Sequence, residues 1–142
     1  MNYLTERKYS FLSDALPHDT FAVVAFTGEE GLSKPYRFDI KLVTQKADID
    51  LDAVMEVMAK LIIHREEGGD ISFNGILASF EQQQEVDGYV FYQAALVPRL
   101  WWLSLTHHNQ VFLDQSVKEI VEAVLKDGGL ASLDFEFRLQ GD

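Results

Sequence analysis

Residues 26–43 read FTGEEGLSKPYRFDIKLV, and this stretch decides the fold class. From position 36 onwards apolar residues alternate with charged ones, and the apolar set is Tyr36, Phe38, Ile40 and Leu42. Because successive side chains of a strand point to opposite faces, this pattern predicts a strand with one buried face. Pro35 is compatible with the first position of such a strand. Gly28 and Gly31 are expected to bracket a loop that precedes it.

Short apolar segments elsewhere in the chain predict further strands. They occupy residues 9–13, 21–27, 61–64, 71–82 and 89–98. Pro17, Gly68 and Gly88 fall between these segments, and both residue types are typical of turns. A bulge is expected near Gly75 in its strand. Turns at such short spacing favour a closed or nearly closed β-barrel of about six strands.

Two segments have the periodicity of helices. Residues 51–58 carry apolar side chains at helical spacing, and Asp50 precedes them as a candidate N-cap. A second helix is expected over about residues 115–127, where Ser116 and Glu119 have the spacing of a capping box. The chain is therefore predicted to be mainly β, with one short helix and one C-terminal helix.

The pattern changes after about residue 106. Residues 1–106 are predicted to form the barrel, and residues 107–142 to begin a second subdomain with its helix and then a strand over 133–139. A lone helix and strand beyond a β-rich body need a partner to pack against. They either close onto the barrel or belong to a longer protein.

The composition restricts the classes of partner. The 142 residues carry a formal net charge of −11, which opposes binding to nucleic acid and to anionic membranes. The absence of cysteine excludes disulfides and thiolate metal sites. The N-terminus lacks the apolar stretch of a signal peptide, and no window resembles a membrane span. We therefore expect cytoplasmic synthesis without a Sec signal and no membrane insertion by this segment.

The residues that carry chemistry do not form a recognisable catalytic or metal-binding pattern. The four histidines are His18, His64, His107 and His108, and their spacing matches no metal motif. Asp48 begins a run that resembles a calcium loop, but the glycine and glutamate that such a loop requires further on are missing. The pairs Glu29-Glu30 and Glu66-Glu67 are expected to lie in turns. We therefore expect no catalytic residue, no metal and no cofactor.

A second informative stretch, residues 94–105, reads AALVPRLWWLSL. Trp101 and Trp102 are adjacent, so in an extended segment they cannot both enter one core. Two interpretations stay open. Either both rings are buried within the monomer by the C-terminal helix, or Trp102 and Arg99 face an interface, where tryptophan and arginine are favoured.

Together the two stretches resemble the N-terminal, phage-tail-hub-like region of VgrG, the spike protein of type VI secretion systems. The matching positions are Phe26, Gly28, Glu30, Leu32, Ser33, Pro35, Tyr36, Phe38, Pro98, Leu100, Trp101, Leu103 and Phe112. The chain departs from the family pattern at Gln110, where an arginine is usual, and at Leu113, where a glutamine is usual.

The resemblance implies a structural role. It implies a barrel of the phage-tail-hub tube-domain type, which assembles as a homotrimer in the full-length protein. The resulting ring would match a hexameric tube protein of the Hcp type, and the machine would deliver the protein outside the cell. The resemblance further implies that the chain is an N-terminal fragment or a very short homologue.

Two other functions compete with this interpretation. One is a stand-alone acidic β-barrel that binds a small apolar ligand, with the Trp101-Trp102 segment at its mouth. The other is a hydrolase that uses paired carboxylates, for which the sequence contains no specific signal.

Overall fold

The structure is a computed structural model that describes residues 8–141. The chain divides into two compact units, Met1–Pro98 and Arg99–Asp142. The division lies before residue 106, where the sequence predicts the end of the barrel. Among the described residues, no helix is both long and apolar enough to cross a membrane.

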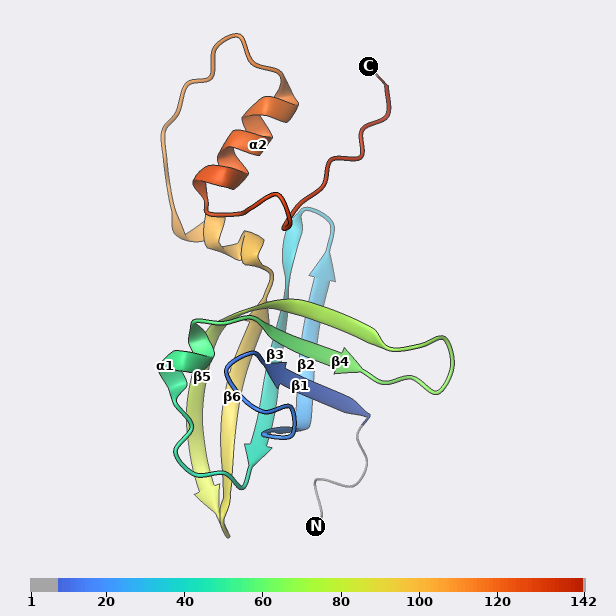
Figure 1. The fold of residues 1–142 in the computed structure, drawn as a ribbon, viewed down its shortest axis with the longest axis vertical. Coiled ribbons are helices and arrows are strands. Elements are labelled where there is room, and N and C mark those ends of the chain that lie inside the picture. The colour runs from blue at the N-terminus through green and yellow to red at the C-terminus, as the bar shows by residue number, and fades with distance from the viewer. Residues whose placement is uncertain (1–7, 142) are drawn as a thin grey trace. The chain divides into compact units, whose positions relative to one another are not determined.

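Six antiparallel strands and one short helix form the first unit (Figure 1). They are β1 (Tyr9–Ser13), β2 (Ala22–Gly31), β3 (Lys34–Thr44), α1 (Leu51–Met55), β4 (Ala59–Ile63), β5 (Ile71–Val86) and β6 (Tyr89–Val97). The strand order is β1-β4-β5-β6-β3-β2, so β1 and β2 lie at the two ends of one sheet. The predicted mainly-β fold with about six strands is confirmed.

The sheet curls until its two end strands approach each other. The ring of Tyr9 on β1 meets the ring of Phe26 on β2 edge-on, with 4.9 Å between the ring centroids. Among residues 8–141 no ladder pairs β1 with β2, so this contact closes the sheet through side chains. The result is a curled six-stranded sheet, a half-barrel, whose end strands meet through side chains.

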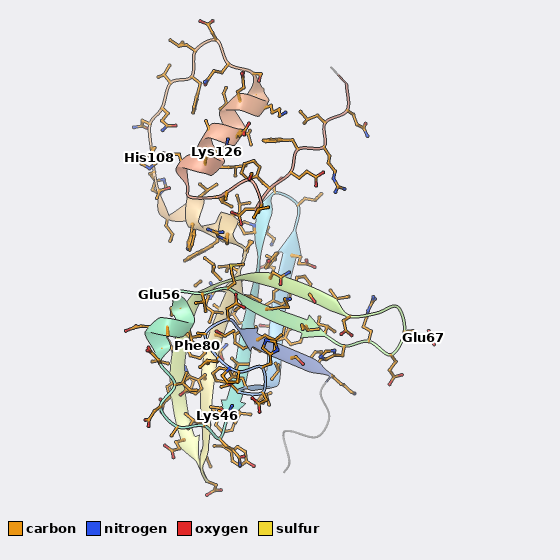
Figure 2. All side chains as sticks on the ribbon, viewed as in Figure 1. Lys46, Glu56, Glu67, Phe80, His108 and Lys126 are labelled. Atoms are coloured by element: carbon orange, nitrogen blue, oxygen red, sulfur yellow. The ribbon has the colours of Figure 1, made fainter. Side chains whose placement is uncertain are left out.

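The inside of the curled sheet is filled by apolar side chains. The alternation predicted for β3 is confirmed, since Phe38, Ile40 and Leu42 are at most 5% exposed. Phe80 of β5, labelled in Figure 2, stacks on the ring of Tyr92 with 5.1 Å between centroids. These large side chains occupy the space that a ligand-binding barrel would leave open.

One local prediction for the first unit is wrong. Gly28 was expected in a loop but lies within β2, where it pairs with Phe38 across the ladder. The bulge expected near Gly75 lies between Leu77 and Ser79, and a second bulge lies between Gln82 and Gln84. The chain turns where the sequence predicts, since Gly68 and Gly88 adopt positive φ angles.

The second unit contains a 3₁₀ helix, η1 (Arg99–Leu105), and an α-helix, α2 (Val117–Asp127). The predicted capping box of α2 is confirmed. The hydroxyl of Ser116 accepts a hydrogen bond from the backbone N–H of Glu119, and the carboxylate of Glu119 accepts one from the backbone N–H of Ser116. The predicted strand over 133–139 is not formed, since these residues pair with no strand in the described part of the chain. An isolated strand has no ladder partner, and its alternation alone cannot hold it extended in a sheet.

Gly75 itself has a packing role. A Cβ atom built on Gly75 would lie 2.0 Å from the carbonyl oxygen of Val97, which belongs to the backbone of β6. Backbone atoms in a central ladder cannot move aside without breaking hydrogen bonds. The position therefore requires glycine for close approach of two chains.

We expect Gly75→Ala to lower the free energy of unfolding by about 2 kcal/mol, because overpacking beside a backbone forces the strands apart. Urea denaturation followed by far-UV circular dichroism, which reports the strands of the first unit, measures the change. Asn74→Ala is the matched control, since Asn74 is the exposed neighbour and should change stability by less than about 0.5 kcal/mol. Equal stability of wild type and Gly75→Ala would contradict this role.

Candidate assembly surface

The hairpin of β2 and β3 projects beyond the rest of the sheet. Strand β6 pairs with β3 from Phe38 to Thr44, so residues 34–37 are paired with β2 alone. Residues 31–34 form the end of this hairpin, which we call the hairpin tip. Leu32 at the tip is 99% exposed, and Ser33 beside it has a φ angle of 60°. A fully exposed leucine on a projecting turn is available for contact with another molecule.

Aromatic packing holds the base of the hairpin. Gly28 and Phe38 face each other across the ladder, and a Cβ on Gly28 would lie 2.2 Å from the Phe38 ring. The Phe38 ring also packs against Phe73 of β5, with 4.4 Å between centroids. Tyr36 donates a hydrogen bond from its hydroxyl to the backbone carbonyl of Asn74. The hairpin is therefore fixed to β5 by both packing and a hydrogen bond.

Charged groups surround the tip. Burial and, to a smaller extent, the nearby charge of Glu30 raise the pKa of Tyr36 above its ordinary value. The hydrogen bond and the positive charge of Lys34 lower the pKa of Glu29. A carboxyl group that acts as the general acid of a glycosidase needs a raised pKa, so this environment does not suit Glu29 for that role.

Two strand edges lack a ladder partner over much of their length. Strand β4 pairs with β5 only as far as Gly75, so further along β5 has a ladder partner on one side, β6. Residues 81–86 of β5 are exposed, and β2 ends the sheet on its other side. The four strands β5, β6, β3 and β2 thus present two edges whose outward backbone groups have no ladder partner among residues 8–141. Such edges are templates for pairing with another chain.

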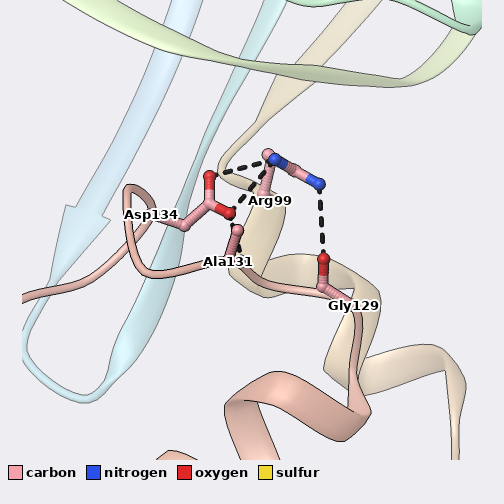
Figure 3. Close-up of polar contacts among 4 residues, drawn as sticks. All are labelled: Arg99, Gly129, Ala131 and Asp134. Atoms are coloured by element: carbon pink, nitrogen blue, oxygen red, sulfur yellow. Dashed lines mark hydrogen bonds and ion pairs between the residues drawn. The ribbon is translucent and has the colours of Figure 1, made fainter.

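In the second unit Arg99 is held by internal contacts, which Figure 3 shows. Its Nη1 donates to both carboxylate oxygens of Asp134, at 3.0 and 3.1 Å, and Nη2 donates to the carbonyl of Gly129 at 3.4 Å. Asp134 also accepts a hydrogen bond from the backbone N–H of Ala131 at 2.6 Å. The guanidinium lies 5.1 Å from the ring of Trp102. Arg99 therefore organises the loop that follows α2.

The remaining motif residues of the second stretch do not gather at one site. Trp102 is 38% exposed and Leu100 is 44% exposed, whereas Trp101 and Leu103 are half-buried. Pro98 and Phe112 are also half-buried. The adjacent tryptophans lie on the 3₁₀ helix η1 and not on an extended strand. Their side chains leave this helix in different directions. An interface at Arg99 and Trp102 remains a prediction.

The apolar stripe of α2 is uncovered. No residue of this helix is buried, and Val117, Val121 and Val124 are 78%, 40% and 38% exposed. An amphipathic helix normally buries such a stripe against a partner. Three apolar positions of α2 are thus exposed to solvent, whereas Ile120 and Leu125 are half-buried.

Sequence reasoning missed one polar constellation. His64 Nε2 lies 2.7 Å from the hydroxyl of Ser10, and His64 Nδ1 lies 2.9 Å from Asp70. Ser10 is distant in the chain from His64 and Asp70, and the pairing of β1 with β4 brings it to them. About half of the Asp70 side chain is exposed to water, whereas a nucleophilic site of these residue types works in a dry, enclosed setting. We interpret the constellation as a link between strands.

Comparison with known proteins identifies relatives over most of the chain. Residues 29–141 match the family described as phage tail baseplate hub (GPD). The chain is 37% identical over 92% of its length to the type VI secretion system spike protein VgrG5 of Pseudomonas aeruginosa, of which it covers 16%. It is 29% identical over 94% of its length to the actin cross-linking toxin VgrG1 of Vibrio cholerae, of which it covers 13%. The chain thus spans less than a fifth of the length of these curated relatives.

A solved structure shares the fold. It is described as the E. coli c3393 protein, a component of the type VI secretion system with structural similarity to the T4 bacteriophage tail proteins gp27 and gp5. The TM-score is 0.70, with 24% identity over 82% of this chain and 31% of that chain. The predicted resemblance to the hub-like region of VgrG proteins is confirmed by these relatives.

We expect Asp134→Asn to destabilise the second unit by about 2 kcal/mol, because the Arg99 guanidinium loses a charged acceptor that is largely shielded from water. Hydrogen exchange at the Ala131 N–H should become faster. Glu136→Gln is the matched control, since Glu136 and its partner Arg138 are both largely exposed and contribute little. Equal exchange rates in the two variants would show that the Arg99 contacts do not order the loop.

We expect α2 to lose stability as the pH falls through the carboxyl range. Hydrogen bonds from the backbone N–H and then the hydroxyl of Ser116 lower the pKa of Glu119 below its ordinary value of 4.5. A group with a lowered folded-state pKa stabilises the fold above the unfolded value, and this contribution disappears as Glu119 becomes protonated. Amide exchange in the first turn of α2, measured between pH 6 and pH 3, reports the effect.

Ser116→Ala should speed exchange in that first turn by about fivefold near neutral pH, since a cap is removed. It should also flatten the pH dependence. Gln115→Ala is the control, because Gln115 precedes the cap and is exposed. An unchanged pH profile in Ser116→Ala would contradict the assignment to this capping box.

Proposed function

This chain belongs to the phage tail baseplate hub (GPD) family, and from that premise we propose that it is a structural part of the spike base of a type VI secretion machine. In this role three copies assemble into a ring, which docks onto a hexameric tube protein of the Hcp type. The protein acts by assembly and not by catalysis. It leaves the cell with the machine and without a Sec signal.

The observation that carries this proposal is the pair of edges on the sheet β5-β6-β3-β2 that have no ladder partner over much of their length. The outer edges belong to two different strands, β2 and residues 81–86 of β5. Contact between two different edges is heterologous, and heterologous contacts repeated by rotation close into rings. A protein whose sheet were covered at both edges would lack this route to a ring.

The uncovered surface of the second unit supports the same role. The apolar stripe of α2 requires a partner, and the curated relatives are more than five times longer than this chain. Arg99 and Trp102 belong to the same unit, and we propose that the exposed part of Trp102 contributes to an interface in the assembly. The other family-motif residues from Pro98 to Phe112 are proposed to shape this unit.

The structure does not favour the alternative of a barrel that binds a small apolar ligand. Phe11, Ile40, Leu61 and Leu96 are almost completely buried and fill the inside of the sheet. The Trp101-Trp102 segment belongs to the second unit and not to the wall of the barrel. No observation on the described residues therefore supports a ligand site of this kind.

We expect light scattering to give a mass of about three times 16.2 kDa that is stable over a concentration series. Each copy carries a net charge of −11, so like-charge repulsion opposes assembly. Raising the ionic strength from about 0.01 to about 0.15 M shortens the Debye length from about 30 to about 8 Å. The trimer fraction should therefore increase with salt.

A mass of 16.2 kDa at every concentration and salt level would contradict self-assembly of this segment. Docking is tested separately by co-sedimentation with assembled tubes of an Hcp-type protein. Acidic, all-helical proteins of similar mass serve as controls for nonspecific association with the tubes. If the fraction of the chain that sediments with the tubes is no larger than the fraction of these controls, the docking role is contradicted.

A further inference from the structure

The sheet of the first unit has two ends along its strands, and the two ends differ in charge. At one end lies the hairpin tip, and residues 29–37 around it contain two glutamates, one lysine and one arginine. At the opposite end, which we call the far end, β3 and β5 finish and β2 and β6 begin. Asp19, Glu85 and Asp87 lie at the far end together with Lys46, so these four side chains carry a net negative charge. The charges around the hairpin tip, in contrast, are balanced.

A pocket of about 330 Å³ opens at the far end. It is lined by Asp19 and Thr20 before β2, by residues 43–46 at the end of β3, and by Tyr89 at the start of β6. Figure 2 labels Lys46 at this end of the first unit. The lining thus combines a carboxylate, an aromatic ring and apolar carbon atoms. The volume is near the lower limit for ligand pockets, so it suits one long side chain.

This lining fits an arginine side chain of another protein. A guanidinium binds a carboxylate such as that of Asp19 and stacks on an aromatic ring such as that of Tyr89. Asp19 already pairs with Lys46 at 3.2 Å, but both side chains are about half exposed or more. Exposed pairs of this kind contribute little, so a second cation can approach Asp19 at low cost. The carboxylates of Glu85 and Asp87 beside the pocket offset the charge of Lys46.

A ring built from the lateral edges of β2 and β5 leaves the far end accessible. In such a ring neighbouring copies lie beside each other across the strands, so the strand ends point along the axis of the ring. Strand β6 finishes at Val97, and its Leu96 pairs with Phe38 at the base of the hairpin. The chain therefore leaves the sheet at the tip end. The far end is an axial surface, and a tube that continues the axis meets a surface of this kind.

We propose that the far-end pocket receives an arginine side chain from a loop of the hexameric tube protein. This inference rests on the proposed function, since it names the surface through which the ring docks onto the tube. The guanidinium binds the carboxylate of Asp19 and lies against the ring of Tyr89. Glu85 and Asp87 attract further basic side chains around the pocket. The contact leaves the edges of β2 and β5 available to neighbouring copies of the ring.

Removal of two carboxylates tests the charge of this surface. The double variant Asp19→Asn with Asp87→Asn should bind assembled tubes of an Hcp-type protein about tenfold more weakly, measured by co-sedimentation at about 0.15 M salt. Asparagine tolerates the positive φ angle of position 87, so the turn is kept. Glu66→Gln with Glu67→Gln is the matched control. It removes the same net charge from the exposed turn between β4 and β5 and should weaken binding by less than about twofold.

Gln45→Trp tests the cavity without a change of charge. Gln45 is exposed and lines the pocket, so a tryptophan there should fill the space and weaken binding to the tubes by about tenfold. Gln140→Trp places the same ring at an exposed position of the second unit and should leave binding unchanged. Circular dichroism should show all variants folded as in wild type, since none of the replaced side chains is buried. Light scattering should give one mass for all of them, because the strand edges are unchanged.

The outcomes separate this inference from the proposed function. If the wild-type chain sediments with the tubes and neither the Asp19 and Asp87 double variant nor Gln45→Trp weakens binding, the inference is overturned and the docking role stands. Equal weakening by the Glu66 and Glu67 double variant would show an effect of total charge and not of the pocket, which also overturns the inference. If the wild-type chain sediments no more than the all-helical controls, the docking role and the inference are both contradicted.

Discussion

The ring of Phe38 joins the parts of the first unit on which the rest of the fold depends. It covers Gly28 on β2, packs on Phe73 of β5 and lies beside Tyr36 of its own strand. Phe26 continues the same cluster to Tyr9 on β1. The curl of the sheet thus depends on aromatic contacts that connect both of its ends. Gly28 is required because any side chain there would displace the ring.

This packing also explains why the β2–β3 hairpin projects as a firm element. Residues 34–37 are paired with β2 alone, yet Tyr36 ties them to the backbone of β5. Several residues of the first motif, among them Gly28, Tyr36 and Phe38, therefore support the barrel itself. Leu32 is different, because no contact within the barrel accounts for a leucine at that position.

The second unit has a different balance of forces. Its order comes largely from polar contacts, namely the capping box of α2 and the bonds of Arg99 to Asp134 and Gly129. Its apolar side chains are mostly exposed, and Leu130 is the one that is clearly buried among the described residues. Such a unit is suited to acquire its core from a neighbouring chain segment or subunit, which agrees with a role in assembly.

The sequence by itself determined the elements whose signal is local. Alternation predicted β3 and its buried face, Gly68 and Gly88 predicted their turns, and Ser116 with Glu119 predicted the start of α2. Tertiary structure decided what depends on distant partners: the place of Gly28 inside β2, the reason for Gly75 and the meeting of Ser10, His64 and Asp70. The alternation over 133–139 was not enough for a strand, because a strand is stabilised by a neighbour and not by its own pattern.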